Sequence, residues 1–225
     1  MVKLPQSFWL IVPYAAWMVL MSVLPATVGG YAVRTAVVAA LLAAGWWQGR
    51  KTRDLRQGPK TRDARQENRL TSSVSRPLTS FVFSLASSLL PGLLVGLAVF
   101  ALWILPEQFD WAWYRRFCIL GEGGTQAVAE ASAAMIAVRL VGSAFVISVA
   151  EELFFRKWLI GFAGFWWMVG LFAIEHDRWL VAALCGVIYG ALYLRKGLFA
   201  AIVAHATTNL VLGLWVLKTG QWQFW

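Results

Sequence analysis

Three short stretches place polar side chains inside segments that are otherwise strongly apolar. They contain Glu152 with Arg156, Glu175 and His176 after Phe172, and His205 with Asn209. Both histidines of the chain lie in these stretches. Ionisable groups at membrane depth are costly and are rarely kept without a use, and a spacing of four places two side chains on one helix face. The three stretches are therefore the first candidates for a functional site.

The first stretch carries two adjacent carboxylates, Glu151 and Glu152. Adjacent residues point about 100° apart on a helix, so only Glu152 is placed to pair with Arg156 one turn later. Glu151 then faces another direction without that partner, and a carboxylate removed from water can serve as a general base. The alternative is an intramembrane ion pair that only fixes helix packing, which leaves the second glutamate unexplained.

The two histidine stretches can supply the rest of a hydrolytic site. His205 and Asn209 offer an imidazole N–H and an amide NH2 one turn apart, two donors of the kind that an oxyanion needs. Asn209 could instead bond a neighbouring helix, and His176 could simply lie at the interfacial end of a span. Taken together, a carboxylate base, a histidine that orients water and a pair of donors form a complete set for attack of water on an amide.

A metal ion is the main alternative to water activated by glutamate alone. Glu151, His176 and His205 could bind zinc, but the zinc-protease motif, two histidines four apart with a glutamate between them, is absent from the sequence. Cys118 and Cys185 lie far apart, with neither metal spacing nor a disulfide framework. We therefore predict metal-independent chemistry without a cofactor and keep zinc as the less favoured alternative.

The composition indicates that these residues lie in a membrane. The chain has 225 residues, of which 60% are hydrophobic and only 14% charged, and its mean hydropathy is +0.64. Soluble domains are about 45–50% apolar and about 25% charged. The composition predicts an all-α, polytopic transmembrane helix bundle of about seven spans (roughly six to eight), each about 20 residues long.

Apolar length places the spans within a single membrane domain, residues 1–225. The expected spans are 8–24, 32–47, 78–105, 127 to beyond 156, 162–174, 179–194 and 198–217. The first run is too long and too rich in tryptophan for a signal peptide. Pro91-Gly92 predicts a kink or a break in the third span. We take 127–217 as the catalytic core helices.

Much of the net charge of +9 lies in one stretch, residues 48–77. A basic loop beside a span is the ordinary mark of the cytoplasmic side. The N-terminus and this loop are therefore predicted to be cytoplasmic, and Arg195-Lys196 falls on the same side. Contact with anionic lipid is the next alternative. The distribution argues against nucleic acid as a partner, because the charge serves to orient the spans.

This orientation raises a question of depth. If the helix bearing Glu151 ends inside and the next segment crosses the membrane, Glu151 and His176 lie at opposite faces and cannot share a site. We expect instead that Glu151 lies near mid-bilayer, about 16 Å along the helix from Leu140 in a hydrocarbon core of about 30 Å. The segment after Gly164 is then expected to be a short or tilted helix that ends near the same depth.

The motifs EExxxR at 151–156, FxxxH at 172–176 and HxxxN at 205–209, in this order, resemble the CAAX prenyl endopeptidase and bacteriocin-processing (CPBP, or Abi) intramembrane protease family. The resemblance covers about residues 127–217 and implies an α-helical intramembrane endopeptidase. In its terms, Glu151 activates water with His176, His205 and Asn209 stabilise the oxyanion, and Glu152 and Arg156 support the site.

A narrower resemblance rests on FAIEHDRW, YLRKG, HATTNLVLG and KTGQWQFW. These segments are similar to the CAAX protease-related branch found with exosortase/PEP-CTERM sorting systems in bacteria. The resemblance implies a multi-pass protein of the bacterial inner membrane, in contact with lipid, whose substrate is a membrane-associated protein or peptide. Components of the exosortase/PEP-CTERM system are then candidate partners.

Two other functions compete with an endopeptidase. The first is a non-proteolytic immunity or scaffold partner of a processing system, in which the polar residues only hold helices together. The second, weaker alternative is a small ion-coupled or proton-coupled transporter. The sequence lacks the matched internal repeats that such transporters usually show.

Overall fold

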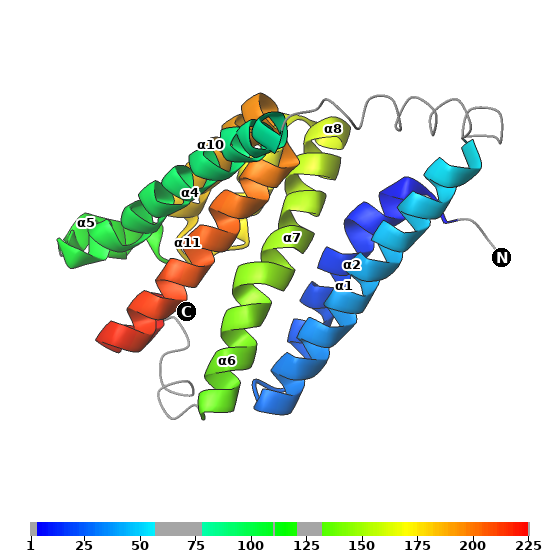
Figure 1. Ribbon diagram of the computed structural model, residues 1–225. Helices are drawn as coiled ribbons and strands as arrows, with labels where there is room; N and C mark the ends of the chain where they lie inside the picture. Colours follow the sequence, from blue (N-terminus) through cyan, green and yellow to red (C-terminus); the bar gives the residue numbers. More distant parts are fainter. Residues whose placement is uncertain (1–3, 57–77, 110, 121–131, 225) are drawn as a thin grey trace.

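The structure, a computed structural model, is a bundle of helices that describes residues 4–56, 78–109, 111–120 and 132–224. Within these ranges every regular element is a helix. Six of the helices are long and apolar enough to cross a membrane. The predicted fold class is confirmed, and the chain is a multi-pass membrane protein (Figure 1).

An N-terminal hairpin is formed by α1 (Gln6–Val23) and α2 (Val28–Arg56). The buried Arg34 guanidinium donates to the carbonyl oxygens of Leu24 and Pro25, at 3.1 Å for Pro25, and so satisfies backbone acceptors that the end of α1 leaves open. Helix α2 continues beyond the predicted end at residue 47. Leucine, arginine, lysine and glutamine are good helix formers, so the first part of the basic stretch extends the helix.

Two long helices, α4 (Leu78–Gln108) and α11 (Leu198–Thr219), pack closely against each other. A Cβ atom on Gly92 would lie 2.8 Å from Val203 Cγ1, and one on Gly96 would lie 2.5 Å from the Ala204 carbonyl oxygen. The small residues thus let the two backbones approach, as membrane helices commonly do. Of the predicted kink or break at Pro91-Gly92, the break is wrong, because α4 runs through these residues without interruption.

One continuous helical stretch of 31 residues, 133–163, lies at the centre. Its successive parts are α6 (Ala133–Val141), η1 (Gly142–Ile147), α7 (Ser148–Glu151), η2 (Glu152–Leu159) and α8 (Ile160–Ala163). The parts η1 and η2 are π-helical. Such turns are rare and often mark functional sites, and here they flank the four residues that end at Glu151.

The chain then turns back at Gly164, whose φ of 96° favours glycine. It forms α9 (Phe165–Ile174) and, after 175–178, α10 (Trp179–Lys196). The ten residues of α9 rise only about 15 Å, about half the hydrocarbon core. The segment 162–174, expected among the spans, is thus a short helix that ends inside the bundle, as the depth argument required.

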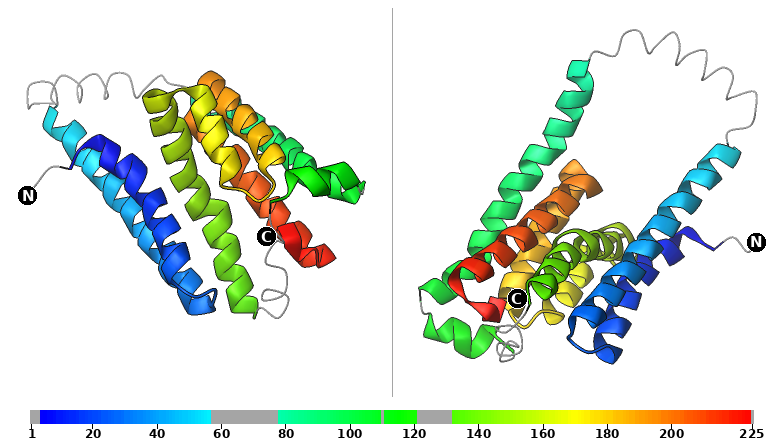
Figure 2. Two further views of the ribbon diagram at one scale, coloured as in Figure 1. Left: turned by 180° about the vertical axis from the view of Figure 1, so that it is seen from behind. Right: turned by 60° about the horizontal axis from the view of Figure 1, so that its bottom comes forward.

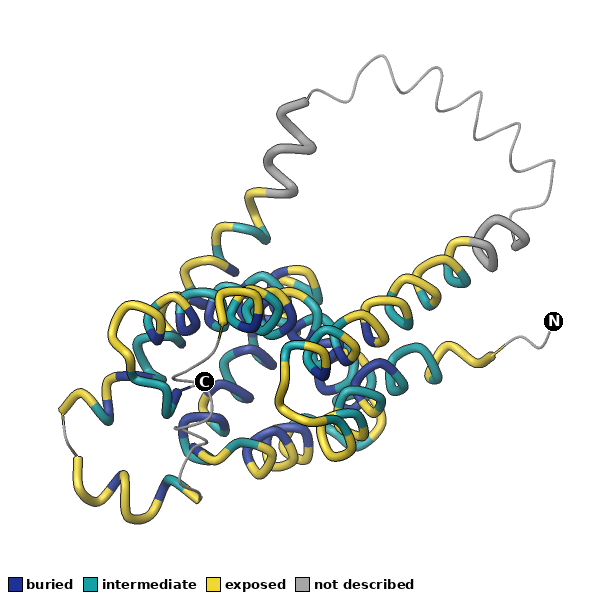
Figure 3. The backbone as a smooth tube through the Cα atoms, turned by 90° about the horizontal axis from the view of Figure 1, so that it is seen from below, coloured by how far each residue is buried: buried dark blue, intermediate teal, exposed yellow. Residues whose placement is uncertain are grey.

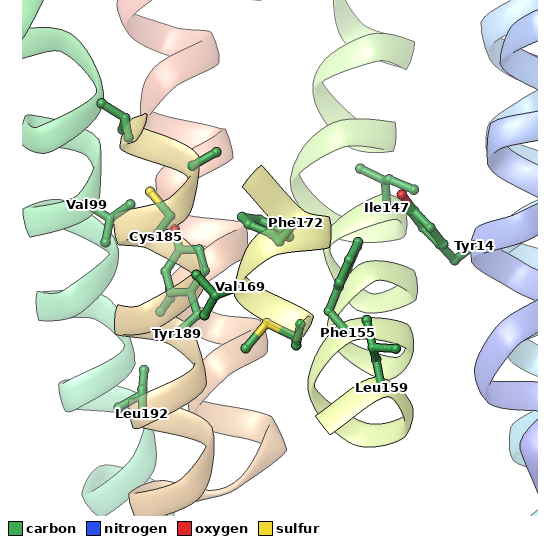
Figure 4. Close-up of a cluster of buried hydrophobic side chains, with 14 of the residues drawn as sticks. Tyr14, Val99, Ile147, Phe155, Leu159, Val169, Phe172, Cys185, Tyr189 and Leu192 are labelled. Carbon is green, nitrogen blue, oxygen red and sulfur yellow. The ribbon is translucent and has the colours of Figure 1, made fainter. Parts of the chain in front are cut away.

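The central stretch separates two groups of helices (Figures 1 and 2). The hairpin α1–α2 packs on one side of it, and α11 packs on the other with α4, α9 and α10. Two short elements, α5 (Ala112–Cys118) and η3 (Trp222–Phe224), lie near the ends of α4 and α11. Buried residues face the interior of the bundle (Figure 3), and aromatic side chains such as Phe155, Phe172 and Tyr189 form much of its core (Figure 4).

Candidate active site

A single cavity of about 200 Å³ brings the predicted residues together. It is lined by Glu151 of α7, by His176 at the end of α9, and by His205 and Asn209 of α11. Glu151 and His176 therefore lie at one depth. The physical reason is the short α9, which returns about 15 Å toward the middle of the bundle after the central stretch has continued about 18 Å beyond Glu151.

Beside the cavity, Glu152 and Arg156 form the predicted ion pair. Their side chains are fully buried, with Arg156 Nη1 3.1 Å from Glu152 Oε1. The Arg156 guanidinium also lies over the ring of Phe172 at 4.3 Å and that of Tyr189 at 5.4 Å. Cation–π contacts are strongest where water is excluded, so the rings help to compensate the burial of this charge.

His205 joins the ion pair to the cavity. Its Nδ1 lies 2.9 Å from Glu152 Oε1, and it must be the donor because a carboxylate only accepts. Its ring stacks on Tyr189, with 5.2 Å between centroids. Its Nε2 lies 3.8 Å from Glu151 Oε2. This nitrogen therefore faces the catalytic side, and it can donate to an oxyanion only when the ring carries a proton on both nitrogens.

Glu151 differs from Glu152 in its surroundings. The Oε2 atoms of both residues are buried without a hydrogen-bond partner in the part of the chain that the structure describes, but only Glu151 borders the cavity. The Nε2 atom of His205 lies 3.8 Å from Glu151 Oε2, a distance too long for a hydrogen bond. Glu151 thus keeps an acceptor atom for a molecule that enters the cavity.

His176 lies in the connection 175–178 between α9 and α10, outside the spanning helices. Its Nδ1 is 2.8 Å from the Phe172 carbonyl oxygen and must donate to it. Burial lowers the pKa of His176, which favours the neutral ring with a free lone pair on Nε2. Phe172 therefore acts twice, through its carbonyl group on His176 and through its ring on Arg156.

Asn209 lies on the same helix face as His205, as predicted, but its two N–H groups are already used. Its Nδ2 is 3.0 Å from the Ser143 carbonyl oxygen and 3.1 Å from Ser148 Oγ. Ser143 belongs to the π-helical η1 and Ser148 follows it directly. The expected cradle of two free donors is therefore not formed in this state, because Asn209 ties α11 to the central stretch.

Sequence reasoning missed several residues of the site. Tyr189 donates to Thr208 Oγ1 at 2.6 Å, and the Thr208 hydroxyl lies 2.8 Å from the Gly96 carbonyl oxygen. Tyr189 and Thr208 both carry a hydroxyl group inside an apolar span, and this signal in the sequence could have identified them. Trp103 and Phe224 also line the cavity, but nothing in the sequence brings these two segments to the motifs.

Two further points concern the acidic residues and a metal ion. Glu175, one of the polar residues of the second stretch, does not line the cavity and accepts a hydrogen bond from Tyr14 of α1. In the described ranges, no three side chains of His, Cys, Asp or Glu converge closely enough to hold a metal ion. Metal independence, and zinc bound by Glu151, His176 and His205 as its alternative, both stay predictions.

Comparison with known proteins gives one match. No curated protein and no solved structure matches the chain. Residues 133–211 match the family model described as type II CAAX prenyl endopeptidase Rce1-like. This segment holds all three motifs and all six predicted site residues. The match supports the resemblance to the CPBP family: over the helices that build the cavity, the chain is similar to a type II CAAX prenyl endopeptidase.

Proposed function

We propose that the protein is an intramembrane endopeptidase that hydrolyses a peptide bond of a membrane-associated protein. The observation that carries this proposal is the cavity itself. Four polar residues from three motifs far apart in the sequence border one space within a bundle of membrane-spanning helices. Of the two glutamates, the one without an ion-pair partner at hydrogen-bonding distance is the one at the cavity.

In the proposed mechanism, water binds between Glu151 Oε2 and the free Nε2 lone pair of His176. Glu151 takes a proton from this water as it attacks the peptide carbonyl carbon, and His176 orients it. The proton then passes to the leaving amine nitrogen. General-base catalysis of this kind contributes about 10²–10⁴-fold. It needs no metal, so cleavage is expected to persist after treatment with a chelator.

The oxyanion is assigned to His205 and Asn209. His205 acts in this role as an imidazolium, with its Nδ1–H on Glu152 and its ring stacked on Tyr189, so that its Nε2–H faces the cavity. Asn209 would contribute one N–H by exchanging its bond to Ser148 Oγ for a bond to the substrate. An oxyanion is the stronger acceptor, because hydrogen bonds to a charged atom are roughly twice as strong as neutral ones.

A scaffold without enzymatic activity is the competing function, and it fits Asn209 and the Glu152–Arg156 pair. It does not explain why Glu151, whose Oε2 is buried without a partner among the described residues, also borders a cavity. On this ground the endopeptidase is favoured. By the narrower resemblance of the sequence, we also propose a location in the bacterial inner membrane, with residues 48–77 cytoplasmic, and work alongside exosortase/PEP-CTERM components.

The test compares the termini of membrane proteins from cells that carry wild-type protein, Glu151→Gln or Glu175→Gln. Glu175 is the matched control, because it is a nearby glutamate that does not line the cavity. At least one new terminus is expected in the wild type and in Glu175→Gln, and its loss is expected in Glu151→Gln at equal protein level. A terminus that persists in Glu151→Gln would contradict the proposal.

A further inference from the structure

The ends of the helices fall on two opposite faces of the bundle (Figure 1). One face carries the end of α2, the start of α4, the end of α8 and the turn from α10 to α11. The other carries the α1–α2 turn, the end of α4, the start of α6 and the end of α11. We call these the first face and the second face.

The sequence between two helix ends of the first face, the end of α2 and the start of α4, is strongly basic. The chain that joins the end of α2 to the start of α4 contains or adjoins nine basic residues against three acidic ones. The basic residues are Arg50, Lys51, Arg53, Arg56, Lys60, Arg62, Arg65, Arg69 and Arg76. Arg195 and Lys196, which end α10, lie on the same face. Short loops rich in lysine and arginine remain in the cytoplasm, so the first face is the cytoplasmic one.

The cavity extends from the catalytic residues toward the second face. His205 lies 14 residues before the end of α11, about 21 Å, and Leu212, which also lines the cavity, lies about 10 Å from that end. Trp103 borders it about 8 Å from the end of α4. Phe224 follows α11 altogether. The lining residues thus continue to the second face.

In the opposite direction the bundle is closed. Along the central stretch from Glu151 toward the first face come Glu152, Phe155, Arg156 and Leu159, which are all at most 4% exposed. The aromatic rings of Phe172 and Tyr189 pack against the same guanidinium. None of Phe155, Arg156 and Leu159 lines the cavity. A charged pair and a packed core therefore separate the cavity from the basic face.

We infer that the cavity opens on the non-cytoplasmic side of the membrane, and that its substrate is an exported segment of a membrane-anchored protein. This inference rests on the proposed hydrolysis for its substrate, but the direction of opening is a property of the fold alone. The apolar lining formed by Trp103, Leu212 and Phe224 fits an apolar side chain next to the cleaved bond. A lipid-modified tail presented from the cytoplasm would meet the closed end.

The direction of opening can be measured by cysteine labelling without any substrate. Cys118 and Cys185 are first replaced by alanine, and single cysteines are then introduced by Ser143→Cys or Leu212→Cys in the cavity. Lys196→Cys and Lys218→Cys, both at exposed positions, report the first and second faces. A charged, membrane-impermeant methanethiosulfonate reagent is added to right-side-out and inside-out vesicles of a bacterial host.

We expect Lys218→Cys and at least one cavity cysteine to react in right-side-out vesicles, and Lys196→Cys to react only in inside-out vesicles. Cavity cysteines that react from the side of Lys196→Cys, or from neither side, would overturn the inference, as would reaction of Lys196→Cys from outside. The same labelling in the Glu151→Gln background separates the two proposals, because opening needs no hydrolysis. If no terminus depends on Glu151, the proposed hydrolysis fails while the labelling still decides the side.

Discussion

The two sides of the central helix, around Glu151 and around Glu152, use the same residue type in opposite ways. Glu152 lies in a fully buried layer, with one oxygen between Arg156 and His205. Glu151, the preceding residue, borders a cavity, and its Oε2 lies 3.8 Å from the imidazole Nε2 of His205. The first layer is built of mutually compensating charges and rings, whereas the second leaves an acceptor for a ligand.

The difference shows how a membrane protein can keep a reactive group in an apolar environment. The buried layer fixes the tautomer and direction of His205, and the Phe172 carbonyl does the same for His176. The polar groups at the cavity can then keep free acceptor atoms, because the buried layer holds their side chains in place. Changes in the buried layer should therefore act mainly on stability, and changes in the cavity layer mainly on chemistry.

The largest stability effect is expected from breaking the buried ion pair. Arg156→Met leaves the Glu152 carboxylate buried without its cation, which should lower the free energy of unfolding by about 3–5 kcal/mol. Replacing both partners, as in Glu152→Leu with Arg156→Met, should recover most of this loss. Unfolding in mixed detergent micelles measures both. Equal stability of Arg156→Met and wild type would show that the pair is not a structural layer.

A smaller effect is expected where α4 meets α11. In Gly96→Ala the new Cβ atom would lie 2.5 Å from the Ala204 carbonyl oxygen, which should cost about 1–3 kcal/mol of unfolding free energy. It should also disturb Thr208, which binds the Gly96 carbonyl oxygen and Tyr189. Gly170→Ala in α9 is the control, since nothing lies within 4 Å of its Cβ position. Loss of stability in the control alone would refute the packing argument.

The smallest effect is a dependence of stability on pH through His176. Because burial lowers its pKa in the folded state, the unfolded chain binds more protons below about pH 6.5. Stability should therefore be complete above about pH 6.5 and fall as the pH decreases, by at most about 1.4 kcal/mol per pH unit. His176→Phe should flatten this slope in unfolding curves between pH 7 and pH 5. An unchanged slope would mean that His176 is not buried in neutral form.

The sequence predicted the bundle and the membership of the site, because both follow from local signals. Apolar length indicates spans, and EExxxR identifies Glu152 as the residue that can reach Arg156 while Glu151 turns elsewhere. The predicted depth of α9 followed from counting residues. These features depend only on helix geometry.

The missing parts depend on packing between distant segments. The bonds of Asn209 to Ser143 and Ser148 arise from a π-helical turn, which no pattern in the sequence marks. The rings around Arg156 come from α9 and α10 as well as from its own turn. Helix α4 also continues through Pro91, because neighbouring helices stabilise a backbone that loses one hydrogen bond.

The most direct test of the central claim is the cleavage rate of purified protein in lipid nanodiscs, compared between wild type and Glu151→Gln. The substrate is a peptide that spans the terminus identified in cells. The variant should lose about 10²–10⁴-fold in rate while its free energy of unfolding stays within about 0.5 kcal/mol of wild type. A rate close to that of wild type, in a variant equally well folded, would contradict the assignment of Glu151 as the base.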